Sequence, residues 1–394
     1  MSDYRIERVE TIVVGGSQAG LAVGYHLARR GRSFVILDAH RRVGDAWRTR
    51  WDSLRLFTPA AFDGLPGMRF PASRTHFPAK DEMADYLEDY ARRFELPVRT
   101  GVRVDAVARN ERGFLVASDD LRFEADNVVV AMSSYGTPRV PEFAAELDPA
   151  LVQVHSAAYR NLSQLQDGGV LIVGAGNSGA DIAMEVAQCH TTMISGRDVG
   201  HLPFPFNRLT AALVFPVVRF VLHHVLKAST SVGAKKKEYL AAGHALPLAR
   251  VKPKDLAAAG VERTARTVGV EDGLPLLEDG RVVDVRNVIW CTGFRPDFSW
   301  IDLPCFGEDG EPAHHRGVVD GEPGLYFVGL NFLHSASSAQ VNGLGRDARY
   351  VVDHIDRFRS NGAAAGGSVP TSVDEHERMV GLGGRSAENP GLSS

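Results

Sequence analysis

The sequence of 394 residues predicts an α/β fold built from two Rossmann-like units. The first observation is an apolar run at residues 11–14 that leads into a glycine-rich turn, a helical pattern and a second apolar run at residues 34–37. The second is that residues 170–195 repeat the same order of elements. The units begin about 160 residues apart, well beyond solenoid repeat lengths, so the chain contains a duplicated architecture and not a repeat array.

The first unit has the features of a dinucleotide site. Its glycine turn lies between a strand and a helix that ends near Gly31, and Asp38 follows the second strand. Glycines let backbone N–H groups approach a pyrophosphate at a helix N-terminus, and an acid after the second strand can accept hydrogen bonds from ribose hydroxyls. Ser17 replaces the middle glycine of the Gly-x-Gly-x-x-Gly pattern and is small enough to keep the approach open. The expected contacts are Gly15, Ser17, Gln18, Ala19, Gly20 and Asp38.

The second unit differs at the position that reads the ribose. Its turn keeps all three glycines, but Ser195 and Arg197 stand where Asp38 stands in the first unit. A carboxylate would repel the 2′-phosphate of NADP, whereas arginine can pair with it and serine can donate a hydrogen bond to it. We therefore expect NADPH rather than NADH, with a solvated surface arginine as the alternative interpretation of Arg197. The expected contacts are Gly174, Gly176, Asn177, Ser178, Gly179, Ser195 and Arg197.

The other elements follow from hydrophobic periodicity. Residues 80–94 carry apolar side chains at helical spacing, and residues 102–131 alternate and turn as a small antiparallel layer would. Residues 282–290 and 325–328 are strand-like, and residues 345–358 predict a final helix. These elements would complete the two units.

The most apolar stretch of the chain is residues 209–226. It is interrupted by Pro216, Arg219, His223 and His224, so it is not a clean membrane span. We expect a buried or interface helix pair here. A substrate-entrance or membrane-surface element is the alternative.

Composition excludes several functional classes. A formal net charge of -4 and a pI near 6.4 argue against a nucleic-acid-binding protein. Cys189, Cys291 and Cys305 are far apart and form no Cys-x-x-Cys pair, so we expect neither a disulfide framework nor a metal site. The polar first ten residues have no signal-peptide core. We therefore expect a cytoplasmic protein.

Residues 15–59 (GGSQAGLAVGYHLARRGRSFVILDAHRRVGDAWRTRWDSLRLFTP) resemble the FAD-binding half of the class B flavoprotein monooxygenases. More specifically, they resemble bacterial flavoproteins labelled as cation-transport-associated. Nearly the whole chain shares the resemblance, except residues 200–250 and the tail. It continues through residues 70–95, 131–138, the second glycine turn, 291–297 and 345–348.

The resemblance implies that FAD binds the first unit and NADPH binds the second, which is inserted into the FAD domain. The implied domains are an FAD-binding domain in two parts, an NADPH-binding domain between them, and a disordered tail. Their bounds are 1–138 and 285–360 for FAD, 139–284 for NADPH and 361–394 for the tail.

The resemblance also implies further cofactor contacts. The turn at residues 44–47 would lie beside the flavin, Val104 would contact the adenine through its backbone, and the start of the last helix would lie near the isoalloxazine and ribityl groups. Residues 131–133 and 291–293 match the two interdomain hinges. The added contacts are Gly44, Asp45, Trp47, Val104, Asp347 and Ala348.

Two departures from the family pattern bear on the reaction. The fingerprint keeps His155 and an aromatic at Tyr159, but Tyr159-Arg160 replaces the Trp-Pro of Baeyer–Villiger enzymes. Phe57 stands where animal members have an asparagine near the flavin, so Asn331 or Asn342 would supply that amide. Asn331 begins a polar loop after a predicted strand end, where ligands bind in open α/β sheets. Asn331 and His155 are therefore the candidate catalytic residues, with an ordinary loop and a structural histidine as the alternatives.

The implied enzyme is an NADPH-dependent FAD monooxygenase. NADPH would reduce FAD, O₂ would add to form a C4a-(hydro)peroxyflavin, and one oxygen atom would pass to a small organic substrate by N- or S-oxygenation or by carbonyl attack. The apolar composition of residues 200–250 suggests a mostly apolar substrate. The alternatives are an NAD(P)H-dependent reductase of a quinone or ferredoxin and a flavin-bound regulator of ion transport. A homodimer is left open, and neither a nucleic-acid partner nor a membrane span is expected.

Overall fold

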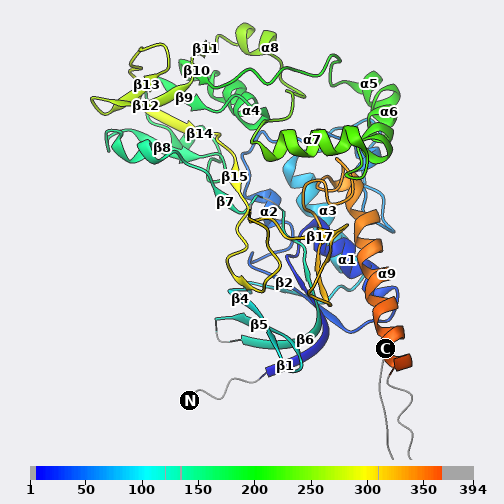
Figure 1. The fold of residues 1–394 in the computed structure, drawn as a ribbon. Coiled ribbons are helices and arrows are strands. Elements are labelled where there is room, and N and C mark those ends of the chain that lie inside the picture. The colour runs from blue at the N-terminus through cyan, green and yellow to red at the C-terminus, as the bar shows by residue number, and fades with distance from the viewer. Residues whose placement is uncertain (1–5, 120, 134, 309, 366–394) are drawn as a thin grey trace, which may run out of the picture. The chain divides into compact units, whose positions relative to one another are not determined.

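The strands of the computed structural model form two main sheets (Figure 1). Among the described residues, the first sheet has ten strands and the second has five. The chain enters the first sheet, crosses to the second and then returns to the first, which confirms the predicted α/β class with Rossmann-like parallel sheets. Both sheets lie in the compact unit Met1–Ile355, and Asp356–Ser394 is a separate unit. The described residues are 6–119, 121–133, 135–308 and 310–365.

The first sheet is built outward from β1 (Ile6–Val14), whose apolar run pairs in parallel on both sides. β2 (Phe34–Asp38) lies on one side and β6 (Leu121–Val130) on the other. Val13 packs in one hydrophobic cluster and its neighbours in another, because alternate strand residues face opposite sides of a sheet. The other strands are β3 (Val98–Thr100), β4 (Ala106–Asn110), β5 (Gly113–Ser118), β16 (Ile301–Asp302), β17 (His314–His315), β18 (Val318–Val319) and β19 (Leu325–Phe327).

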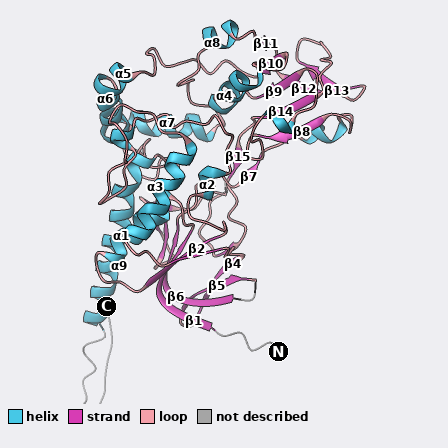
Figure 2. Ribbon diagram, turned by 180° about the vertical axis from the view of Figure 1, so that it is seen from behind, coloured by secondary structure: helices cyan, strands magenta, loops and turns pink. Residues whose placement is uncertain are grey.

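Three helices pack against the face that carries Val13 (Figures 1 and 2). They are α1 (Gln18–Ala28), α3 (Lys80–Arg93) and α9 (Val341–Ala365). The predicted helix over 80–94 is confirmed to within one residue. The last helix starts before and ends after its predicted bounds, so residues 361–365 of the predicted tail are helical. The rest of that predicted tail lies outside the described residues.

The second sheet is parallel throughout and has the strand order β11-β10-β9-β14-β8. β14 lies between β8 and β9, and all four of its residues are buried. The expected domain boundary at residue 284 is therefore too early, because β14 belongs to the second sheet. The bounds are β8 (Val152–His155), β9 (Val170–Val173), α4 (Asn177–Val186), β10 (Thr192–Ser195), β11 (Glu262–Thr264) and β14 (Asn287–Trp290).

The two predicted hinges lie beside each other. β7 (Thr137–Pro138) follows the first hinge and pairs with β15 (Phe294–Arg295), which follows the second. The predicted antiparallel layer is also confirmed, since β4, β5 and β6 pair in that manner. The remaining short elements are α2 (Asp45–Arg48), η1 (Ala60–Phe62), η2 (Glu142–Glu146), η3 (Leu162–Gln164), α8 (Pro253–Ala258), β12 (Thr267–Glu271) and β13 (Leu274–Leu277).

The apolar stretch 209–226 is helical, as predicted, but it is not a buried helix pair; its role as an interface stays a prediction. It forms α5 (Arg208–Leu213), α6 (Phe215–Phe220) and the π-helical turn η4 (Val221–Val225), and α7 (Ser231–Ala241) follows. Several of its large apolar side chains are exposed to solvent. None of the helices in the described residues is long and apolar enough to cross a membrane.

Candidate dinucleotide and active site

The first glycine turn leaves no room for a side chain at Gly15 or Gly20. Gly15 has φ +108°, and a Cβ on Gly20 would lie 1.8 Å from the carbonyl oxygen of Gly15. Helix α1 starts directly after Ser17, whose side chain makes no capping hydrogen bond. The first N–H groups of the helix are thus available to a phosphate. The turn therefore fits a pyrophosphate.

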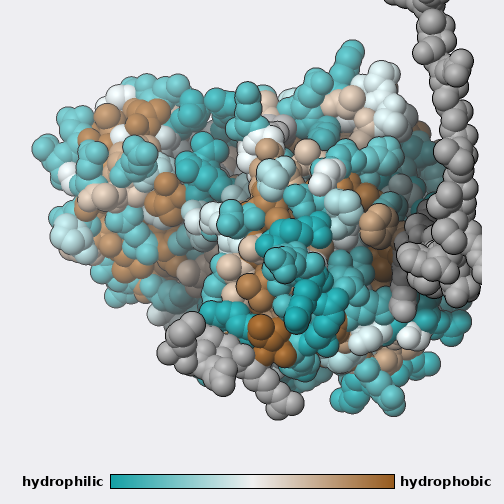
Figure 3. All heavy atoms as spheres, turned by 60° about the horizontal axis from the view of Figure 1, so that its bottom comes forward, coloured by the Kyte–Doolittle hydropathy of each residue, from teal (hydrophilic) through white to brown (hydrophobic). Residues whose placement is uncertain are grey.

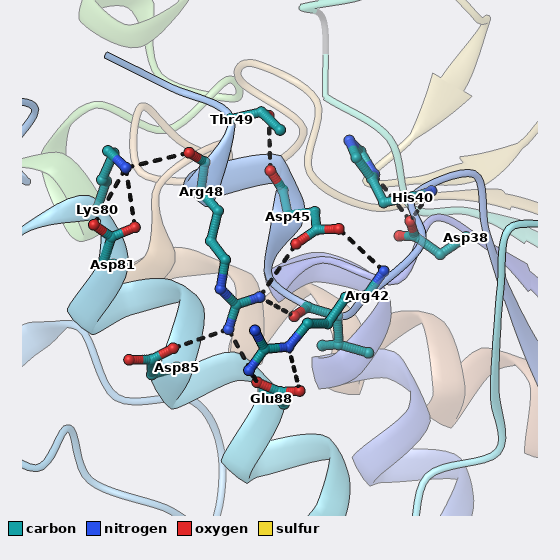
Figure 4. Close-up of polar contacts among 11 residues, drawn as sticks. Asp38, His40, Arg42, Asp45, Arg48, Thr49, Lys80, Asp81, Asp85 and Glu88 are labelled. Atoms are coloured by element: carbon teal, nitrogen blue, oxygen red, sulfur yellow. Dashed lines mark hydrogen bonds and ion pairs between the residues drawn. The ribbon is translucent and has the colours of Figure 1, made fainter. Parts of the chain in front are cut away.

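Asp38 lies at the end of β2 and faces this turn. Its Oδ2 accepts a hydrogen bond from Gly16 N at 2.5 Å. Its Oδ1 accepts from His40 N at 2.7 Å and from His40 Nδ1 at 2.9 Å (Figure 4). Burial by itself raises the pKa of Asp38, but the hydrogen bonds from His40 and Gly16 outweigh it and lower that pKa. The carboxylate is therefore ionised and suited to accept a ribose hydroxyl. Val102 N donates to Asp38 O at 2.9 Å, which brings the nearby Val104 to the same end of the site.

The predicted flavin turn at residues 44–47 is tied to both neighbouring helices. Trp47 Nε1 donates to Gln18 Oε1 at 3.0 Å, which joins the turn to α1. Arg48 donates to Asp85 at 2.9 Å and to Glu88 at 3.0 Å on α3, and its Nη1 lies 3.3 Å from Asp45 Oδ1 (Figure 4). The Asp45 carboxylate thus holds the turn in place. Sequence patterns did not identify Arg48 as the residue that connects it to α3.

Asp347 lies in the second turn of α9. It is fully buried, and its Oδ1 accepts from Arg346 Nε at 3.1 Å. Its Oδ2 has no hydrogen-bond partner among the described residues. A buried acceptor without a partner is costly, and a ligand hydroxyl would satisfy it. Asp347 therefore fits the predicted flavin site, whereas the Ala348 side chain packs in the hydrophobic core.

The loop at residues 331–338 lies next to Asp347 in the chain and is covered by the segment after η4. Ala228 N donates to His334 O, and Ala336 N donates to Leu226 O, both at 2.9 Å. The hydroxyls of Ser335, Ser337 and Ser338 are buried and bond within the loop. The loop beyond Asn331 is therefore largely buried and is held by its own hydrogen bonds.

The two candidate amides lie in different surroundings. Asn331 is exposed, whereas Asn342 Oδ1 lies 3.1 Å from His223 Nε2 of η4. Arg346 Nη2 donates to Ser335 Oγ at 3.0 Å and its Nη1 lies 3.4 Å from His223 Nδ1. The polar network thus includes Asn342 and not Asn331. The sequence had no signal for His223 or Arg346, because both partners are distant in the chain.

The second glycine turn repeats the geometry of the first. Gly174 has φ +115°, and a Cβ on Gly179 would lie 1.9 Å from Gly174 O. Gly176 precedes α4 and has no neighbour closer than 3.8 Å to an added Cβ, so the backbone is open to a ligand there. The side chain of Asn177 bonds Pro247 O and Ala249 N, so it holds a neighbouring segment and leaves the backbone to contact a nucleotide. Ser178 is half-buried in the first turn of α4.

The prediction that Ser195 contacts the nucleotide phosphate is wrong. Ser195 is fully buried, its Oγ donates to Ala265 O at 2.9 Å, and it accepts from Thr267 N at 2.7 Å. Its hydroxyl therefore holds the sheet to the next loop. Arg197 is exposed two residues later, as the prediction requires. Arg263 Nη2 donates to Gly196 O at 2.9 Å, which adds a second guanidinium at this edge that the sequence did not reveal.

His155 has both ring nitrogens bonded to backbone atoms of this chain. Its Nδ1 accepts from Ala157 N and its Nε2 donates to Gly293 O, both at 3.1 Å. Burial lowers the pKa of the ring, so it is neutral and both nitrogens are in use. The structure thus supports the alternative interpretation of a hydrogen-bonded structural histidine. It fixes the hinge at Gly293 against the end of β8.

Asp63 and Asp181 are buried carboxyl groups whose pKa values are raised by burial. Asp63 is fully buried, Thr58 Oγ1 donates to it, and burial raises its pKa to about 8. Asp181 on α4 pairs with Arg250 at 3.1 Å beside a cavity of about 410 Å³, and burial raises its pKa. That cavity is lined by residues 52–55 and α4 and does not include either glycine turn.

Known proteins resemble the chain over most of its length. A family model for pyridine nucleotide-disulphide oxidoreductases matches residues 12–200. An uncharacterized CzcO-like oxidoreductase of Geobacillus kaustophilus is 38% identical over 88% of this chain and 98% of its own. A probable indole-3-pyruvate monooxygenase, YUCCA3 of Arabidopsis thaliana, is 27% identical over 81% of each chain. The solved flavin-containing monooxygenase of Stenotrophomonas maltophilia is 28% identical, with a TM-score of 0.68 over 90% of this chain and all of that one.

Proposed function

Because the chain belongs to the CzcO-like oxidoreductases of the class B flavoprotein monooxygenase family, we propose that it is an NADPH-dependent FAD monooxygenase. The protein is a flavin-dependent oxidoreductase that uses FAD and NADPH. The finer proposal is that it transfers one oxygen atom from O₂ to a small, mostly apolar organic substrate. The products would be the oxygenated substrate, NADP⁺ and water.

The observation that carries the proposal is the pair of matched glycine turns. In each turn the last glycine lies against the carbonyl oxygen of the first. A Cβ added to Gly20 would lie 1.8 Å from Gly15 O, and a Cβ added to Gly179 would lie 1.9 Å from Gly174 O. Two such turns suit two dinucleotides. In the first unit the strand after the helix ends at Asp38, which suits the ribose of FAD. In the second unit the corresponding strand ends beside Arg197 and Arg263, which suit the 2′-phosphate of NADPH.

FAD held at the first turn would supply a hydride acceptor for NADPH and, in its reduced form, the means to activate O₂. The protein supplies binding and orientation. The Asp347 Oδ2 would accept a hydrogen bond from a cofactor hydroxyl, and Arg346 holds that carboxylate at 3.1 Å. The segment 226–228, bonded to residues 334–336, would exclude water from this side of the site.

The domain assignment is also part of the proposal. The FAD-binding domain would comprise residues 1–138 and the chain from 291 to 360, and the NADPH-binding domain would comprise residues 139–290. The second bound is moved from 284 because β14 pairs within the second sheet. The three free cysteines, none in a Cys-x-x-Cys pair, suit the reducing cytoplasmic compartment that we propose.

The test uses the purified full-length holoenzyme and methyl phenyl sulfide as a soft, apolar probe. We expect NADPH consumption that depends on O₂, a preference for NADPH over NADH, and one ¹⁸O atom from ¹⁸O₂ in the sulfoxide. If NADPH oxidation produces only hydrogen peroxide, but a benzoquinone accepts the electrons at higher rate without O₂, the protein is a reductase and the monooxygenase proposal is wrong.

A further inference from the structure

The helical segment α5–η4 presents a continuous apolar stripe to solvent. We name it the outer stripe, and it comprises Leu209, Leu213, Val217, Phe220 and Val225. Their exposed fractions are 67%, 65%, 61%, 59% and 43%. Positions three or four residues apart lie on one face of an α-helix, and positions five apart do so in a π-helical turn such as η4, so these side chains share the outer face. An apolar face of this kind on a surface helix indicates a binding site.

The opposite face of the same segment is already packed. Ala211, Phe215 and His223 are buried, and Phe215 contacts Phe77 and Phe206 through ring packing at 5.6 Å and 5.3 Å. The outer stripe is therefore not the side of these helices that packs on the protein core. It is a second apolar face on a helix whose first face is satisfied.

Basic residues lie within the outer stripe segment and just after it in the sequence. Residues 208–240 contain six Lys or Arg and a single acid, Glu238, whereas the rest of the chain has 38 Lys or Arg against 47 Asp or Glu. A local positive charge of this size therefore stands out against an acidic protein. The six are Arg208, Arg219, Lys227, Lys235, Lys236 and Lys237.

Within the described part of the chain, none of these six side chains forms an ion pair. Arg219 lies over the ring of Phe62 at 5.6 Å, and Lys236 lies over Tyr239 at 4.3 Å. Neither contact neutralises the charge. The segment with the outer stripe therefore retains positive charge that the described protein does not compensate.

We propose that the outer stripe and these six basic residues bind the surface of an anionic lipid bilayer. A helix face with apolar side chains and flanking Lys and Arg lies in the plane of such an interface, where the apolar side chains enter the acyl boundary and the cations meet anionic headgroups. A second copy of the chain fits less well, because a two-fold interface would place this positive patch against itself. Figure 3 brings the bottom of Figure 1 forward, the end away from α5 and α6, and on that face hydrophobic residues are mixed with hydrophilic ones.

The outer stripe leads directly to the proposed active site. η4 is followed by residues 226–228, whose backbone bonds residues 334–336, and His223 of η4 contacts Asn342. Binding of the outer stripe to a bilayer would thus bring this cover of the site to the lipid surface. The lipid binding itself does not depend on the proposed reaction, so it is tested without a substrate.

The experiment measures flotation of the full-length holoprotein with vesicles. One set is phosphatidylcholine alone, and the other contains about one third phosphatidylglycerol. We expect binding to the anionic vesicles that is at least tenfold stronger than binding to the neutral ones and that weakens as salt is raised. Equal flotation with both vesicles, or none with the anionic ones, would overturn the proposal.

Variants locate the binding surface. The stripe variant Leu213→Ser, Val217→Ser, Phe220→Ser should lower affinity for anionic vesicles about a hundredfold. The matched control Leu121→Ser, Val268→Ser, Val282→Ser removes exposed apolar residues elsewhere and should bind like the unaltered protein. Flavin absorbance checks that each variant folds. The proposal is refuted if the control loses vesicle binding or if the stripe variant keeps it. It is also refuted if the protein does not bind vesicles but sediments as a dimer that only the stripe substitutions dissociate.

Discussion

The two glycine turns should be separable by mutation. Gly20→Ala changes only the first turn and Gly179→Ala changes only the second. If the turns hold different dinucleotides, Gly20→Ala should lose FAD, and Gly179→Ala should retain FAD but bind NADPH weakly. The control is Gly269→Ala in β12, where an added Cβ has no neighbour within 4 Å.

The structure gives the size of the effect. Alanine normally stabilises a helical position by roughly 0.5–1 kcal/mol relative to glycine. The new methyl of Gly179→Ala would lie 1.9 Å from Gly174 O, whereas atoms in contact are about 3.5 Å apart. The turn must therefore open by more than about 1 Å. Such overpacking costs roughly 1–3 kcal/mol, and misplacement of a binding group by about 1 Å costs about a hundredfold. The clash thus outweighs the helix preference.

The assay measures bound FAD by absorbance after purification and NADPH affinity by anaerobic titration of the holoenzyme. Gly179→Ala should contain the normal amount of FAD and bind NADPH about a hundredfold more weakly. Gly20→Ala should be purified with little FAD. If Gly179→Ala loses FAD and Gly20→Ala keeps it, the assignment of the cofactors to the two turns is reversed. If both variants behave like Gly269→Ala, neither turn holds a dinucleotide.

Three further predictions concern single side chains. Arg197→Ala and Arg263→Ala should each lower kcat/KM for NADPH by about tenfold and leave that for NADH unchanged, and an equal loss with both would contradict the 2′-phosphate contact. Ser195→Ala should leave this selectivity unchanged but lower the free energy of unfolding by about 1–3 kcal/mol, because Thr267 N loses its buried acceptor, and a changed selectivity would contradict its structural role. Burial raises the pKa of Asp63 from 3.8 to about 8, so the folded state binds this proton more tightly and stability falls as pH rises through that interval. The thermal midpoint of the unaltered protein should therefore fall relative to Asp63→Asn between about pH 4 and 8, and parallel curves would refute this.

The elements nearest the first glycine turn could be predicted from the sequence because local rules specify them. The strand, turn and helix at residues 11–28 depend on an apolar run, on glycines and on spacing, and the structure has them within a few residues. Helix α3 follows from apolar spacing in the same way. The last strand of the second sheet was misassigned because β14 is separated from β9 by more than a hundred residues, and pairing over such a distance has no local signature.

In the candidate site, too, the residues whose roles depend on local backbone were predicted, and those with distant partners were not. Asp38 and both turns lie where the sequence predicts, because their roles depend on the backbone of one unit. Ser195 was misjudged because the loop that takes its hydroxyl comes seventy residues later in the chain. His155 likewise bonds a carbonyl at Gly293, which nothing in its own segment indicates.

By itself, the sequence determined that two Rossmann-like units are present and where each phosphate turn begins, because glycine placement and strand–helix periodicity act within about thirty residues. Only the tertiary structure decided which polar side chains are hydrogen-bonded within the protein and which can still bind a ligand. It satisfied Ser195 and His155 with distant backbone partners, left the Asp347 Oδ2 unpaired among the described residues, and turned the outer stripe toward solvent. The reason is physical: whether a side chain is buried, paired or exposed depends on neighbours that the fold brings from elsewhere in the chain.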